Sequence, residues 1–138
     1  MNTYVFTIKG NHDDPVGNAI PKLKMTGRQH WMPKAQSYVR WKAHVVNAFS
    51  SRTKMVNKID LGNDSLKEGK KKPIVIPEGK KAYMHLMIFW KDNRRADPEN
   101  VFGSIADALF ENDKYLAGSF DFETIPGGIG KVEVTIKI

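Results

Sequence analysis

The chain of 138 residues contains no cysteine. Neither a disulfide framework nor a thiolate metal site can form, which fits a reducing compartment. The first ten residues lack the basic start and long apolar stretch of a signal peptide. The longest apolar run, near residues 84–90, is far shorter than the ~20 residues that cross a bilayer. We therefore expect a cytoplasmic protein without a membrane partner.

A glycine-rich phosphate-binding loop is also missing. The stretch PGGIGK, residues 126–131, lacks the spacing and the following helix of such a loop, and we interpret it as a turn before the last strand. What the chain does have is an excess of positive charge. Lys and Arg outnumber Asp and Glu by 22 to 15, which gives a net charge of +7. This excess favours a polyanionic partner such as nucleic acid, although a basic protein can also be merely soluble.

Length and hydrophobic periodicity predict a single α+β domain over residues 1–138, a mixed β-sheet packed by two main helices. Alternating or continuous apolar residues predict strands at residues 4–9, 82–90 and 131–138. Helical spacing of apolar residues predicts one helix beginning at Pro33 and a second from Pro98 to about Phe110. Residues 10–32 are expected to form a long loop, and residues 61–81 a loop or a mobile hairpin.

The most informative stretch is RRADPENVFGSIADALFENDKY, residues 94–115. Asp before Pro is a good helix start, since the Asp97 carboxylate can accept a hydrogen bond from the free N–H of Glu99 or Asn100. Glu99 in the first turn complements the helix dipole. On these grounds alone, capping is favoured over metal binding for Asp97.

Three further observations favour a metal site. The helix directly follows a central strand, so Asp97 and Glu99 lie at its carboxyl end, where sites are common in α/β sheets. Asp113 comes after the helix, and a return of the chain could bring it to the same edge. Arg94 and Arg95 precede the acids, and carboxylates beside arginines suit a site that holds Mg²⁺ and neutralises phosphate.

Helical geometry places Asn100, Gly103 and Asp107 close to one face of this helix, beside its core stripe. Asp107 therefore points off the core. Because it lies more than two turns from Glu99, we expect it to be a supporting or helix-surface residue and not a metal ligand.

These motifs resemble the RusA-type Holliday-junction resolvases and their phage relatives. The family core reads Arg-Arg-x-Asp-x-Asp-Asn, then Asp-Ala-Leu, then an acidic pair, and residues 94–115 follow this order. Residues 20–39, IPKLKMTGRQHWMPKAQSYV, are similar to the basic loop, turn and Tyr-bearing helix of the family. The resemblance implies a Mg²⁺-dependent endonuclease, with Mn²⁺ as an alternative ion, that acts as a homodimer on four-way DNA junctions.

Carried over residue by residue, the catalytic and metal-binding acids become Asp97, Glu99 (where Asp is usual) and Asp113. Asn112 replaces the first member of the acidic pair. The family's catalytic lysine corresponds to Gly103, so either Lys91, Arg95 or Lys114 supplies the cation, or activity is weak or lost.

The expected DNA contacts lie in the basic loops and at the arginine pair: Lys22, Lys24, Arg28, Lys70, Lys71, Lys72, Arg94 and Arg95. Asn100, Asp107, Asn112 and Lys114 are the expected supporting residues. Two alternatives stay open: a relative that binds branched DNA without cutting it, and a small basic interaction module with no role on DNA.

Overall fold

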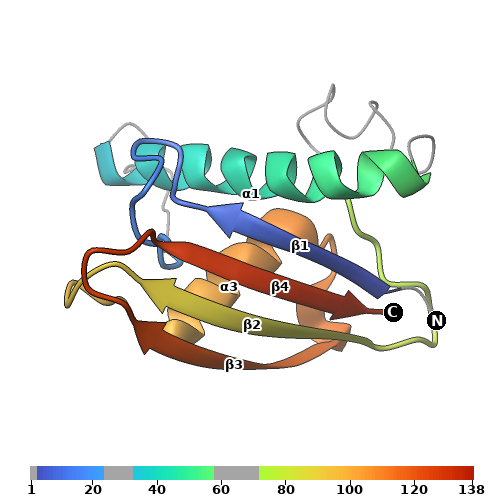
Figure 1. Ribbon diagram of the computed structural model, residues 1–138. Coiled ribbons are helices and arrows are strands. Elements are labelled where there is room, and N and C mark those ends of the chain that lie inside the picture. Colours follow the sequence, from blue (N-terminus) through green and yellow to red (C-terminus); the bar gives the residue numbers. More distant parts are fainter. Residues whose placement is uncertain (1–2, 24–32, 58–71) are drawn as a thin grey trace.

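The computed structural model describes residues 3–23, 33–57 and 72–138. Two α-helices and four strands form one small α+β domain, as the sequence predicts (Figure 1). In chain order the elements are β1 (Thr3–Lys9), α1 (Pro33–Asn57), β2 (Ala82–Trp90), α3 (Pro98–Leu109), the 3₁₀ turn η1 (Asp113–Tyr115), β3 (Leu116–Thr124) and β4 (Lys131–Lys137). No helix in the described ranges is long and apolar enough to cross a membrane.

The four strands form one mixed sheet in the order β1-β4-β2-β3. β4 pairs antiparallel with both β1 and β2, whereas β2 and β3 are parallel, with Ala82 opposite Leu116 and Trp90 opposite Thr124. Two parallel neighbours need a crossover, and α3 supplies it. As a result, α3 begins at the carboxyl ends of β2 and β3 and ends at their amino ends (Figure 1).

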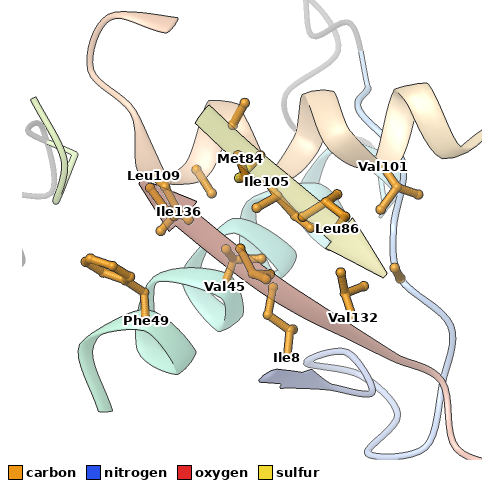
Figure 2. Packing of buried hydrophobic residues seen from close by; sticks show 14 of the residues in the cluster. Ile8, Val45, Phe49, Met84, Leu86, Val101, Ile105, Leu109, Val132 and Ile136 are labelled. Atoms are coloured by element: carbon orange, nitrogen blue, oxygen red, sulfur yellow. The ribbon is translucent and has the colours of Figure 1, made fainter. Parts of the chain in front are cut away.

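Both helices pack against the same face of the sheet. Every second residue of β2 and β4 is buried beneath them, which is the period that a half-covered strand requires. Figure 2 shows how the apolar side chains of α1, α3 and the strands meet: Ile8, Val45, Phe49, Met84, Leu86, Val101, Ile105, Leu109, Val132 and Ile136. A buried hydrogen bond from the Trp41 indole to the Ser104 hydroxyl, at 3.0 Å, links α1 to α3.

Strand β3 is the element that the sequence patterns miss. It lies at the sheet edge, so its inward-facing Phe120 and Phe122 stay 37% and 50% exposed and Gly118 interrupts its alternation. The sequence of β3 therefore shows neither the alternation of a half-buried strand nor the period of an amphipathic helix. Residues 10–23 and 72–81 form no helix or regular strand, apart from an isolated bridge between Ile74 and Phe110. Lys24, Arg28, Lys70 and Lys71 fall outside the described residues.

Candidate metal and phosphate site at the start of α3

Asp97 caps α3, as its sequence context predicts. Its backbone is extended (φ −66°, ψ 123°), and its Oδ1 accepts a hydrogen bond of 2.9 Å from the N–H of Glu99. Pro98 occupies the first helical turn, where its missing N–H costs nothing. The second oxygen, Oδ2, accepts no hydrogen bond from the described residues. Capping therefore leaves half of this carboxylate open to a ligand.

Glu99 lies on the first turn of α3, two residues after Asp97. Its side chain is exposed and forms no ion pair or hydrogen bond within the described residues. The helix starts at the carboxyl end of the central strand β2, the location that the sequence predicts for these two acids. Two exposed carboxylates thus lie at the start of α3, near the partial positive charge of the helix N-terminus.

Asp113 does not join them within a single chain. Asp113 opens η1, directly before β3, and β3 runs parallel to β2. Asp113 therefore lies at the amino ends of these two strands, whereas Asp97 lies at their carboxyl ends. The 12 residues of α3 separate the two ends by about 18 Å at 1.5 Å per residue. The expected return of the chain to the Asp97 edge is therefore absent. No cluster of three or more metal-ligating side chains occurs in residues 3–23, 33–57 and 72–138.

The neighbours of Asp113 share its location. Asn112 precedes η1 without capping it by a side-chain hydrogen bond, and the Lys114 ammonium lies 4.9 Å from the centre of the Tyr115 ring. Both residues are far from Asp97 along α3. Lys114 therefore cannot replace, in the same chain, a cation at the start of this helix.

The loop between β2 and α3 is organised by a network that sequence reasoning missed. Asn18 accepts a hydrogen bond from the N–H of Lys91 at 2.7 Å and donates one to Asp92 at 3.1 Å. The Lys91 ammonium binds Asp14 at 3.2 Å, and Arg94 binds Asp92 at 2.8 Å. Asn18 lies 73 positions before Lys91, so no local pattern could reveal the contact.

This network engages two of the expected cations. The hydrogen bond from Arg94 is the main reason that the pKa of Asp92 falls to about 2. Lys91 is similarly held by Asp14, whose pKa is lowered by hydrogen bonds from the Val16 backbone and from Lys91. Of the three cations between β2 and α3 (Lys91, Arg94 and Arg95), Arg95 alone is exposed and without an ion pair among the described residues.

Lys22 reaches the same helix from the first loop. Its backbone N–H donates a 2.8 Å hydrogen bond to the carbonyl of Asn100. Its aliphatic stem covers Gly103, since a Cβ at that position would lie 3.3 Å from the Lys22 Cδ and 3.6 Å from its Cβ. The position at which the family resemblance implies a lysine is thus covered by the side chain of a different lysine.

Asp107, on the same side of α3, is fully engaged by other residues. Its carboxylate accepts hydrogen bonds from the Tyr38 hydroxyl at 2.9 Å and from Lys72 at 3.1 Å, and Lys42 lies 3.5 Å away. Burial alone would raise the pKa of Asp107, but these hydrogen bonds and positive charges outweigh it and lower that pKa. Burial, followed by the same carboxylate, raises the pKa of Tyr38. Asp107 is therefore held by α1 and by the segment before β2, and no hydrogen bond or ion pair joins it to Asp97 or Glu99 among the described residues.

Lys72 is the one member of the basic cluster at residues 67–72 that the structure describes. Besides its ion pair with Asp107, its backbone N–H donates a 3.0 Å hydrogen bond to Glu111. These two contacts fix the end of the lysine-rich segment on α3.

Comparison with known protein families and with curated proteins finds no match for this chain.

Proposed function

We propose that the protein is a metal-dependent endodeoxyribonuclease that cuts branched DNA, with the four-way junction as its substrate. The observation that carries the proposal is the exposed pair of Asp97 and Glu99, in which capping occupies only one carboxylate oxygen. A cap needs no second carboxylate and no neighbouring free cations. Lys22 and Arg95 nevertheless lie near the start of α3, and the motif resembles that of the RusA-type resolvases.

The residues present suit Mg²⁺ held by two carboxylates. Mg²⁺ prefers hard oxygen ligands and keeps several waters, so it is commonly bound through one or two carboxylates together with substrate phosphate. Asp97 and Glu99 supply such oxygens, and the chain offers no thiolate that would select a softer metal. When bound there, the ion would lower the pKa of a coordinated water and neutralise charge on the phosphate.

Hydrolysis of the phosphodiester then requires little further chemistry from the chain. The water oxygen bonds to phosphorus as the bond from phosphorus to the 3′ oxygen breaks, leaving a 5′ phosphate and a 3′ hydroxyl. The free carboxylate oxygens at the start of α3 can accept the proton that the water loses. The 3′ oxygen takes up a proton from solvent, so that the overall reaction adds one water across the broken bond.

Positive charge near α3 supports the choice of DNA as the substrate. Two ammonium groups, those of Lys42 and Lys72, lie beside α3 and share the carboxylate of Asp107. Lys22 and Arg95 add two exposed cations. Each phosphate contact releases counterions, so we expect binding to weaken steeply as salt rises.

A homodimer fits the two-fold symmetry of a junction, because two sites could then nick opposite strands. Strand β3 offers a surface for a second copy: it is the sheet edge and carries the exposed side chains of Phe120 and Phe122. Asp113 would enter the site only if the Asp113 of a partner copy lay close to Asp97 of this chain. Asp113→Asn distinguishes the cases, since nicking is unchanged for a site built by one chain and lost for a site shared by two.

The test uses a synthetic four-way junction with labelled strands, incubated with Mg²⁺ or with EDTA. We expect paired nicks that need Mg²⁺ and that fall by at least about 100-fold in Asp97→Asn, because the metal contributes several kcal/mol at the transition state. Glu78→Gln is the matched control. It removes another exposed carboxylate, in the turn before β2, and should nick at the wild-type rate.

One observation favours a second candidate, a protein that binds branched DNA without cutting it. Within the described ranges no third metal-ligating side chain joins Asp97 and Glu99, and the helix carries Gly103 where the resemblance implies a lysine. Salt-sensitive binding of the junction without Mg²⁺-dependent nicks would support this candidate. Absence of any junction binding at low salt would contradict both candidates and favour a basic interaction module.

A further inference from the structure

Gly103 and Lys22 form a contact that neither helix formation nor core packing explains. Gly103 is not in a left-handed conformation, and glycine within a helix costs about 1 kcal/mol relative to alanine. A side chain at this position would point at the stem of Lys22, within 3.3 Å of its Cδ. The glycine thus leaves room on the helix surface for a lysine from another segment.

The backbone of Lys22 is fixed as well as its stem. Its N–H is bonded to the Asn100 carbonyl, one turn before Gly103, and the preceding residues are tied to the β2 edge through Asn18. The ammonium, two bonds beyond Cδ, is therefore within reach of the turn of α3 that runs from Asn100 to Gly103. The backbone of Lys22 is thus already ordered when this cation meets a ligand, which lowers the entropy cost of binding.

Lys22 differs from its cationic neighbours in its ion pairing within residues 3–23, 33–57 and 72–138. Lys91 is paired with Asp14, Arg94 with Asp92, and Lys42 and Lys72 with Asp107. Lys22 is exposed and has no ion pair within the described residues. Arg95 also has no ion pair among these residues, and its side chain forms no hydrogen bond with another described residue.

We infer that Lys22 is the catalytic cation of this site, contacting a non-bridging oxygen of the scissile phosphate beside Asp97 and Glu99. The inference rests on the proposed nuclease function and assigns to the first loop the charge that Gly103 cannot provide from the helix. An ammonium held there stabilises the additional negative charge of the pentacovalent transition state. The basic first loop then contributes to the chemistry as well as to DNA affinity.

The experiment compares four variants: Lys22→Ala, Lys22→Arg, the double variant Lys22→Ala with Gly103→Lys, and Lys81→Ala. The double variant returns a lysine to the same turn of α3, from the helix instead of the loop. Lys81 is the matched control. It is an exposed lysine directly before β2, at the amino end of this strand and away from the start of α3. Two quantities are measured: single-turnover nicking of the junction with Mg²⁺ at saturating protein, and junction binding in EDTA over a range of salt concentrations.

We expect Lys22→Ala to lower the nicking rate by about 100-fold, the loss seen when one preorganised transition-state donor is removed. In EDTA, the slope of log K against log salt should fall by about 0.9, the value for one phosphate contact. Lys22→Arg should retain most of the binding, and the double variant should recover a large part of the nicking. Lys81→Ala should change neither quantity, and thermal unfolding should show that every variant is folded.

Several outcomes would overturn the inference. If wild type nicks and Lys22→Ala nicks equally fast, Lys22 is not catalytic while the proposed function stands. If the folded double variant nicks as slowly as Lys22→Ala, a lysine on this turn of α3 does not replace Lys22. The placement of Lys22 over Gly103 then does not explain its effect on nicking. If wild type does not nick, the nuclease proposal fails first. Lys22 is then judged on binding in EDTA, where an unchanged salt slope in Lys22→Ala removes its phosphate contact too.

Discussion

Two aspartates of the same helical region, Asp97 and Asp107, have opposite surroundings. Asp107 is half-buried and satisfied by a tyrosine hydroxyl and two lysines from α1 and the segment before β2. Asp97 is exposed, and one of its carboxylate oxygens accepts the hydrogen bond that caps α3. The other oxygen accepts no hydrogen bond from the described residues. A carboxylate whose partners are all intramolecular stabilises the fold, whereas one with a free oxygen can bind an outside ligand. Asp107 therefore contributes to the fold, whereas Asp97 is available for the metal binding of the proposed function.

The rate of junction nicking should show the largest difference between variants of Asp97 and variants of Asp107. Asp97→Asn keeps a good cap, because Asn and Asp are about equal at this position, but it removes a charged metal ligand. We expect its nicking to fall by at least about 100-fold and Asp107→Asn to lose less than about 10-fold. Equal losses in the two variants, measured on the same junction, would remove the distinction between the two aspartates.

Stability should show the reverse order. Asp107→Ala leaves the buried Tyr38 hydroxyl without its acceptor, which costs about 1–3 kcal/mol. The two partly exposed lysine pairs add at most about 1 kcal/mol each. Asp97→Asn should change the unfolding free energy by less than about 0.5 kcal/mol. Urea unfolding of both variants and of Tyr38→Phe measures these differences, and a stable Asp107→Ala would contradict the structural role.

The pH dependence sharpens the same contrast. The pKa of Asp107 is lower in the folded protein, so its contribution to stability is fully present above the unfolded pKa of about 3.9 and is lost as pH falls through the folded value. The difference in unfolding free energy between wild type and Asp107→Asn should therefore shrink on acidification. Asp13 and Asp92, whose pKa values fall to about 2, titrate in both proteins and cancel. A difference that stays constant down to low pH would show that the charge of Asp107 is not what stabilises the fold.

The smallest expected effect concerns the residue between the two aspartates. Gly103→Ala improves helix propensity by up to about 1 kcal/mol, and the flexible stem of Lys22 can shift by a few tenths of an ångström to accept the methyl group. We expect slightly higher resistance to thermal unfolding together with slower nicking, because the Lys22 ammonium is displaced. Faster nicking in a more stable Gly103→Ala would show that the lysine is better placed elsewhere.

Local patterns were sufficient for part of the fold and part of the site. The period of apolar residues predicts β1, β2, β4 and both helices, and the Asp-Pro pair predicts the cap at Asp97. Strand β3 escapes because an edge strand needs no alternation of buried and exposed residues to be stable. The position of Asp113 was unpredictable from spacing, since it depends on β3 running parallel to β2.

The sequence by itself determined the absence of thiolate chemistry, the positive charge, the alternation that builds the sheet and the acids at the start of α3, because each depends on residue type and local spacing. Only the tertiary structure decided which charges remain free. Asn18 and Asp14 meet the loop after β2, and Tyr38 and Lys42 meet Asp107, across long stretches of chain. Lys22 comes to lie over Gly103 in the same way, because packing the first loop against α3 brings together residues that no local period connects.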